Sequence, residues 1–436
     1  MSATEHRIAG TAPVAATRHR LPRRRLVAAS IGNALEWYDW TIFGLFSIYF
    51  AGQFFPEEHP TLALLNTFAA YAVAFFFRPL GGIILGRFAD VRGRKPALLL
   101  TIVLMAGGSA LIGLTPNFGQ IGWAAPILLI LGRIAQGLAV GGEAANSNAY
   151  LAEIAEPSHR GRYSSFFQIS TASAVLLASL TAFFLARALS EESMISYGWR
   201  VPFIVGGILG VIGIWLRRSL AETEVFDQRK GVATRIRRPL MTTLRRNPAA
   251  VVQVVSITAL STLCFYTFFA ALTPFATKGR GADPVDVFLM LSIATAIFVL
   301  LQYPAAKLSD HIGRKPVLLF SSAAIAVTIV PLSTLIGPDL LGLAVCLIVG
   351  LALYSMITSI LPAIMSELFP TELRSLGIGA WYNTTVAVFG GTAPLILTAL
   401  NAAGQSTLFF WYVAASGVAM FLVMLKLPET RGITLA

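Results

Sequence analysis

The stretch GRFADVRGRKP at residues 86–96 returns as AKLSDHIGRKP at residues 306–316. Each copy follows the second apolar run of its half of the chain and precedes the third. An acid followed by an arginine recurs after the fourth and tenth runs: Glu153 with Arg160, and Glu367 with Arg374. Two motifs that recur in the same order indicate two halves of similar structure.

The repeated stretch places an acid before a tight glycine turn and a basic pair. The matched residues are Asp90, Arg94 and Lys95, and Asp310, Arg314 and Lys315. An aspartate there can pair with a cationic cluster and with the N-terminus of a neighbouring helix. We expect a conformational latch between the halves, made by these residues together with Glu153, Arg160, Glu367 and Arg374. The alternative is a loop whose positive charges only keep it on one side of a membrane.

Composition places the chain in a membrane. Of its 436 residues, 56% are apolar and 12% charged, and the mean hydropathy is +0.72. Soluble domains have about 25% charged residues. So little charge excludes a soluble enzyme, a DNA-binding domain and a secreted disulfide scaffold. The two cysteines, Cys264 and Cys346, lie inside apolar runs without metal-ligand spacing, so we expect them to pack.

Twelve apolar runs are long enough to cross a bilayer, since a helix needs about 20 residues to do so. They lie near 26–50, 62–86, 97–115, 122–151, 164–187, 199–216, 249–275, 285–306, 317–336, 340–366, 375–401 and 407–426. We expect an all-α membrane protein with two pseudo-symmetric six-helix bundles. The expected division is a basic N-tail (1–25), a first bundle (26–216), a central loop (217–247), a second bundle (248–426) and a C-tail (427–436).

Most of the 33 lysines and arginines fall in the segments on the same side as the N-tail. The positive-inside rule therefore predicts that both termini are cytoplasmic. The central loop 217–247 contains nine of these basic residues. It is either a charged connection between the bundles or a site for anionic headgroups or a partner.

Five ionisable residues fall inside the spans, all in the first half: Glu36, Asp39, Arg78, Arg133 and Glu143. A charge at the bilayer centre costs about 2.5–3.5 kcal/mol and marks a functional site by default. The second half offers neutral polar groups instead, among them Tyr266, Tyr354, Tyr382 and Asn383. This asymmetry is the most informative feature of the spans.

The acids of the first span are candidates for proton coupling. Glu36 and Asp39 are three residues apart and share a helix face with Asn33. Two neighbouring carboxylates out of water favour protonation of at least one. We expect Glu36 or Asp39 to carry the proton, with Arg133 and Glu143 as further coupling candidates. The alternative is that both acids stay ionised and pair with the arginines.

The intramembrane arginines indicate an anionic substrate, because guanidinium groups stay charged and bind carboxylates in bidentate fashion. We expect Arg78 to bind a substrate carboxylate, and Arg133 to serve coupling or a second carboxylate. The remaining substrate-binding candidates are Asn33, Tyr266, Tyr354, Tyr382 and Asn383. A tyrosine in a membrane helix is also commonly a packing residue.

The chain resembles a major facilitator superfamily transporter over essentially its whole length, and within it the metabolite:proton symporter family. Besides the repeated motif, the resemblance rests on GNALEWYDW (32–40), RPLGG (78–82), RIAQGLAVGGE (133–143) and LPETRG (427–432). SELFPTELRSLGIG (366–379) in the second half is most similar to the α-ketoglutarate permease branch.

The resemblance implies a secondary active transporter of the bacterial inner membrane rather than an enzyme, and neither HExxH nor a P-loop occurs. It implies alternating-access import of a small organic acid with protons, such as the oxo-dicarboxylate α-ketoglutarate. Tricarboxylates, aromatic or shikimate-like acids and proline/betaine-type zwitterions stay open, and so does a non-transporting sensor. We expect a functional monomer without nucleic-acid partners, metals or other cofactors.

Overall fold

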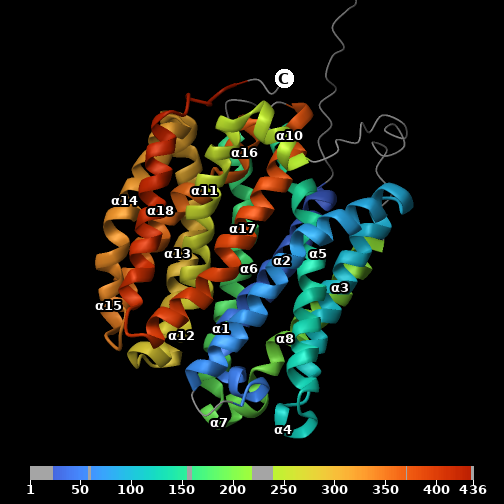
Figure 1. The fold of residues 1–436 in the computed structure, drawn as a ribbon, viewed down its shortest axis with the longest axis vertical. Coiled ribbons are helices and arrows are strands. Elements are labelled where there is room, and N and C mark those ends of the chain that lie inside the picture. The colour runs from blue at the N-terminus through green and yellow to red at the C-terminus, as the bar shows by residue number, and fades with distance from the viewer. Residues whose placement is uncertain (1–22, 57–59, 155–159, 219–238, 370, 434–436) are drawn as a thin grey trace, which may run out of the picture.

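The computed structural model describes residues 23–56, 60–154, 160–218, 239–369 and 371–433, and the regular elements in these ranges are all helical. Within them, some side chains lie outside the described residues: 23–32, 90, 94–95, 142–154, 216–218, 239–240, 242 and 371–378. Long helices run along the molecule, with the first half of the chain beside the second (Figure 1).

The first half contains six long helices: α1 (Arg23–Phe54), α2 (Pro60–Arg92), α3 (Arg94–Leu114), α5 (Ala124–Ile154), α6 (Arg160–Ala188) and α8 (Arg200–Arg218). Three short elements connect them: α4 (Phe118–Ile121), α7 (Glu191–Ser193) and η2 (Met194–Gly198).

The second half begins with α10 (Pro239–Arg246) and α11 (Pro248–Tyr266), and α11 continues through η3 (Thr267–Ala271), α12 (Leu272–Pro274) and η4 (Phe275–Gly279). It goes on with α13 (Pro284–Ile312), α14 (Arg314–Thr334), α15 (Leu340–Thr358), α16 (Leu361–Leu368), α17 (Thr371–Ala402) and α18 (Ser406–Leu425). Eleven helical segments are long and apolar enough to cross a membrane, and α1, with 32 residues, completes the expected twelve.

The repeated motif forms the same turn twice. Gly93 ends α2 with φ 99° and Gly313 ends α13 with φ 106°, a region that favours glycine. The amide of Gly93 donates to the Ala89 carbonyl at 3.0 Å, and that of Gly313 to the Ser309 carbonyl at 3.0 Å. Each turn starts the next helix at once, so the repeat has the same backbone geometry in both halves.

The halves meet through two helix pairs: α6 packs on α13, and α2 packs on α17. In Figure 1 the blue α2 and the orange-red α17 lie side by side at the centre. One end of the molecule carries α10 and α16, and the opposite end carries α4, α7 and α12. We call these ends the α10 face and the α4 face.

Small residues let α2 and α5 approach closely. A side chain at Gly81 would overlap the Leu138 carbonyl, and one at Gly137 would overlap the Ala74 carbonyl. One at Gly141 would overlap the carbonyl of Arg78 itself. Close backbone contact of this kind is a usual source of helix association in membranes. It fixes the helix that carries Arg78 against the helix that carries Arg133.

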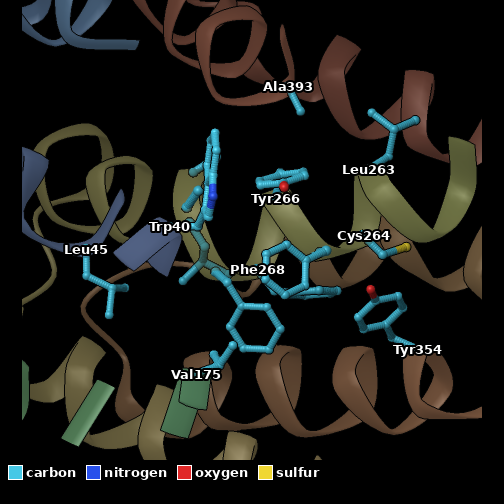
Figure 2. Packing of buried hydrophobic residues seen from close by; sticks show 14 of the residues in the cluster. Trp40, Leu45, Val175, Leu263, Cys264, Tyr266, Phe268, Tyr354 and Ala393 are labelled. Carbon is cyan, nitrogen blue, oxygen red and sulfur yellow. The ribbon is translucent and has the colours of Figure 1, made fainter. Parts of the chain in front are cut away.

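Aromatic residues fill the space between the halves. Figure 2 shows Trp40 of α1 and Tyr266 of α11, both of which contact Phe75, with ring centroids at 4.4 and 5.1 Å. Cys264, two residues before Tyr266 on α11, is buried and forms no disulfide, and the same is true of Cys346 on α15. The packing role expected for both cysteines agrees with these surroundings.

Candidate functional site

A narrow cavity of about 60 Å³ lies between the two halves. Helices α1 and α6 form one wall, and α11, α13, α15, α16 and α17 contribute to the other. Its polar lining consists of Trp37, Gln168, Thr171, Ser261, Thr262, Tyr266, Tyr354, Thr358 and Tyr382. The lining drawn from the described side chains carries hydrogen-bonding groups but no charge. Small-molecule sites are commonly found at interfaces of this kind, where a few polar groups converge.

Three of the predicted tyrosines meet in this cavity. Tyr266, Tyr354 and Tyr382 all line it and lie within electrostatic reach of one another. The hydroxyl of Tyr354 is 3.4 Å from that of Ser261. The hydroxyl of Tyr266 makes no hydrogen bond to the described residues. The cavity therefore holds a cluster of hydroxyl groups with at least one free donor.

Arg78 lies next to this cluster, although it is not one of the lining residues. Its side chain is 2% exposed, and the guanidinium carbon is 4.2 Å from the ring centroid of Trp40 and 4.4 Å from that of Phe75. Its Nε and Nη2 atoms make no hydrogen bond to the described residues. Aromatic faces offset part of the cost of burying a cation, about 0.5–2 kcal/mol each. Two of the three guanidinium nitrogens of Arg78 are therefore left without a hydrogen bond to the described part of the chain.

Arg133 occupies the other side of the same aromatic cluster. It is fully buried, and its guanidinium carbon is 4.2 Å from the ring centroid of Trp40, 4.3 Å from Phe43 and 4.7 Å from Tyr71. Its Nη1 donates to Gln136 Oε1 at 2.7 Å. One tryptophan ring therefore contacts both intramembrane arginines.

Asp39 is connected to Arg133 through a chain of hydrogen bonds. Gln136, which accepts from Arg133, donates through Nε2 to Ser109 Oγ at 2.8 Å, and Ser109 donates to Asp39 Oδ2. The other carboxylate oxygen has no partner among the described residues, and Gly206 of α8 leaves it room. The predicted coupling acid and arginine are thus joined indirectly, across α1, α3 and α5.

Glu36 and Asp39 both line a second, smaller cavity of about 20 Å³ inside the first half. This cavity lies between α1, α3, α5 and α8. Asn33 takes a different position: it donates to Thr171 Oγ1 at 2.9 Å and accepts from Trp37 Nε1 at 3.1 Å. Thr171 and Trp37 both line the central cavity, so Asn33 holds two residues of the cavity wall in place without lining the cavity itself.

Asn383 is not among the residues that line the central cavity. Asn383 donates to the Gly379 carbonyl at 2.8 Å, and its Oδ1 makes no hydrogen bond to the described residues. The side chain of Glu143 lies outside the described residues.

The second copy of the repeated motif contacts the first half on the α10 face. Asp310 Oδ1 accepts from the Gly161 amide and Oδ2 from the Arg162 amide, both at 3.1 Å. These amides belong to the first turn of α6, whose dipole favours a carboxylate. Arg162 Nε and Arg314 Nη1 add charge at 3.4 and 2.7 Å from Asp310. Asp310 thus contacts a helix N-terminus and basic side chains, as the repeat predicts, while its role as a latch stays a prediction.

Glu367 is a second acidic residue that binds arginines of the same network. Arg160 of α6 pairs with Glu367 of α16 at 3.1 Å, and Arg314 Nε lies 3.5 Å from Glu367 Oε2. All three side chains are almost completely buried. Lys315 donates instead to the Leu425 carbonyl at 2.9 Å, within the second half. The side chains of the other latch candidates lie outside the described residues: Asp90, Arg94, Lys95, Glu153 and Arg374.

The segment after α18 joins this network, which sequence reasoning missed. Glu429 accepts from the amides of Arg314 and Lys315 at 2.8 and 3.2 Å. Thr430 donates to Glu367 Oε2 at 2.7 Å. Both residues belong to the motif LPETRG, so the sequence marks them as candidates for a functional role. The order of the segments along the chain does not predict that this motif contacts the turn between α13 and α14.

Trp40 and Ser109 were also missed. Trp40 lies in the stretch 32–40 next to Asp39, where tryptophan is a common interfacial residue. Ser109 is one of many small polar residues of the spans, and no spacing singles it out.

Comparison with known proteins gives one family. A sequence model of the Major Facilitator Superfamily matches residues 29–394 and 254–433. The chain is 38% identical to the alpha-ketoglutarate permease of Escherichia coli (strain K12) over 93% of its own length and 94% of the permease. It is 32% identical to a citrate-proton symporter of Salmonella typhi, with 86% of each chain covered. It is also 32% identical to a Staphylococcus aureus (strain MSSA476) protein provisionally described as a proline/betaine transporter, over 92% of this chain and 87% of that one.

Solved structures show the same fold. A D-xylose-proton symporter matches with a TM-score of 0.74 at 21% identity, covering 95% of this chain and 99% of that one. A partially occluded, inward-open xylose transporter from E. coli matches with a TM-score of 0.75 at 20% identity, with the same coverage.

Proposed function

The chain belongs to the Major Facilitator Superfamily, and we propose that it is a proton-coupled symporter that imports a small organic acid. One observation carries the choice of an acid: the buried guanidinium of Arg78 has two nitrogens without a partner, next to the free hydroxyl of Tyr266. Buried donors without an acceptor are costly. A carboxylate entering from the central cavity would accept hydrogen bonds from these two nitrogens.

Within this proposal, the substrate is a dicarboxylate or oxo-dicarboxylate. The three tyrosine hydroxyls and Ser261 offer hydrogen bonds to the uncharged or second polar end, while Arg78 takes one carboxylate. The similarity to an alpha-ketoglutarate permease supports this choice. Citrate-like tricarboxylates are the second candidate, because a citrate-proton symporter is also a relative.

Protons are the coupling ion in the proposed cycle, and Asp39 is the preferred proton carrier. Its carboxylate is buried and reaches Arg133 through Ser109 and Gln136. Protonating Asp39 would weaken its hold on this chain of hydrogen bonds, and binding an anion at Arg78 would reduce the repulsion between the two arginines. Both events would then favour the rocking of the halves about the central cavity. Glu36 is the alternative carrier.

Uptake into proteoliposomes of purified protein, under an inward proton gradient, tests the proposal. Radiolabelled α-ketoglutarate, succinate, citrate, shikimate, proline and betaine would be compared. We expect accumulation of a dicarboxylate that a protonophore collapses. If the protein transports proline or betaine but none of the organic acids, the proposal of an anion-binding site is wrong. Binding without uptake of any of these compounds would favour a sensor.

A further inference from the structure

The short helix α10 has one face without a partner among the residues that the structure describes. Met241 and Leu244 on this helix are 47% and 38% exposed, and Arg245 and Arg246 in its last turn are exposed as well. Residues three and four apart lie on the same side of a helix. Met241, Leu244 and Arg245 therefore form one surface, which we call the α10 outer surface.

The opposite side of α10 is fixed to the second half. Thr243 is 1% exposed, and its Oγ1 accepts a hydrogen bond from Trp381 Nε1 of α17 at 2.9 Å. Residues two apart on a helix do not face each other, so Thr243 points away from the α10 outer surface. Figure 1 shows α10 at one end of the molecule, above α17.

This position places α10 at the level of a membrane surface. Only Asn247 separates α10 from the spanning segment that begins at Pro248. Val252, in the second turn of that segment, is 51% exposed and continues the apolar edge. At such a boundary, apolar side chains reach the acyl chains while arginines reach the headgroups.

The charge of the segment selects the headgroup. Residues 217–247 contain nine lysines and arginines against three acidic residues. Basic clusters next to a spanning helix attract anionic lipids, and each arginine near such a surface strengthens association about fivefold. A zwitterionic headgroup offers no net charge to this cluster.

We propose that the α10 outer surface binds the headgroups of anionic phospholipids through Arg245. We propose further that this contact acts on the central cavity through α17. The hydrogen bond from Trp381 to Thr243 joins α10 to α17, and the next residue, Tyr382, lines the cavity. The proposed lipid binding does not depend on the proposed transport function. The proposed effect of lipid on the cavity does rest on that function.

Hydrogen exchange of the intact protein in nanodiscs tests lipid binding. Peptides that cover residues 239–247 would be followed in phosphatidylcholine alone and in a mixture with phosphatidylglycerol. We expect exchange in the mixture to be slower by about fivefold, from Arg245. The variant Arg245→Gln should lose the difference. The control Arg187→Gln, an exposed arginine at the far end of α6, should keep it. Equal exchange of the wild-type protein in both lipids would overturn the proposal.

Uptake in the same two lipids tests the effect on the cavity. We expect the wild-type protein to transport several-fold faster with phosphatidylglycerol, and Trp381→Phe to keep the protection of α10 while losing this acceleration. Equal acceleration in both proteins would overturn the route through Trp381. Protection of α10 without transport in either lipid would support lipid binding and contradict the proposed transport function instead.

Discussion

Trp40 contacts two buried guanidinium groups, those of Arg78 and Arg133, each 4.2 Å from its ring centroid. An aromatic face attracts a cation but accepts no conventional hydrogen bond, so stacking leaves the N–H edges available. Both arginines keep Nε and Nη2 without a hydrogen bond to the described residues, while Nη1 of Arg133 donates to Gln136. Arg78 differs in lying next to Tyr266, which lines the central cavity, so we propose Arg78 as the substrate ligand.

Replacing Arg78 tests this assignment. We expect Arg78→Gln to reduce the initial rate of proton-driven uptake by about 10–100-fold, since a lost charge-assisted hydrogen bond costs about 1.5–3 kcal/mol. Arg78→Lys should restore little, because an ammonium group neither stacks nor binds a carboxylate in bidentate fashion. Rates would be normalised to the amount of folded protein. Arg187→Gln is the control, and a wild-type rate in Arg78→Gln would remove Arg78 from the site.

Replacing Asp39 tests proton coupling. Asparagine keeps the size of the side chain but takes up no proton, so Asp39→Asn should abolish accumulation driven by a pH gradient while substrate exchange continues. Wild-type uptake should rise as the outside pH falls, because the carrier must be protonated on that side, and the variant should show no such rise. Uptake and counterflow would be measured against outside pH.

Two comparisons make the Asp39 experiment specific. Asp339→Asn is the control, since Asp339 only caps the first turn of α15 and asparagine caps equally well. Glu36→Gln is the competing variant. If Glu36→Gln loses the pH response and Asp39→Asn keeps it, the proton carrier is Glu36.

Among the elements, the twelve spans were predicted within a few residues, but their interruptions were not. The run 249–275 was expected as one helix, and the structure divides it into α11, η3, α12 and η4. In η3, Ala270 lies so close to Gly44 of α1 that a Cβ there would be 2.7 Å from its Cα. The change from α-helix to π-helix at this point accompanies close contact with a neighbouring helix. The pattern of apolar residues in the sequence does not predict such a change.

Two glycines of α2 allow the close packing of α2 on α5 to be tested with a matched pair of variants. A Cβ at Gly81 would overlap the Leu138 carbonyl, while one at Gly86, five residues later on α2, meets nothing within 4 Å. We expect Gly81→Ala to destabilise the protein by about 1–3 kcal/mol through overpacking. Gly86→Ala should leave stability unchanged or slightly raised, because alanine favours a helix. Thermal unfolding in detergent would compare them, and equal melting temperatures would contradict the close packing.

For the whole molecule, contacts between the halves lie on both sides of the central cavity. On the α10 face they are the buried pairs of Asp310 and Glu367 with Arg160 and Arg162. Toward the α4 face, Phe46 stacks on Phe288 with ring centroids 6.4 Å apart, and Lys278 lies 3.8 Å from Glu191 at the surface. Exposed pairs contribute little, whereas breaking a buried pair costs about 3–5 kcal/mol. The α10 face is thus held more firmly.

Removing the charge of Asp310 should release the α10 face. Asp310→Asn leaves Arg314 and Arg162 without their shared acid, so the halves should separate there and uptake should fall. Spin labels at Arg87 of α2 and Lys307 of α13, both exposed, would report the separation after Cys264 and Cys346 are replaced by alanine. We expect longer distances than in the parent. Asp286→Asn, at the other end of α13, is the control, and an unchanged distance distribution would contradict the latch.

The sequence by itself determined the membrane location, the twelve helices, the repeat with its glycine turn, and which residues are charged inside the spans. These follow because lipid forces each crossing segment to satisfy its own backbone hydrogen bonds, so length and composition suffice. Only the tertiary structure decided which charges meet: both arginines on Trp40, Asp39 joined to Arg133 through Ser109, and Glu429 on the α13–α14 turn. Such contacts depend on how helices rotate and cross, and in lipid those choices are made by close packing and interhelical hydrogen bonds rather than by an apolar pattern.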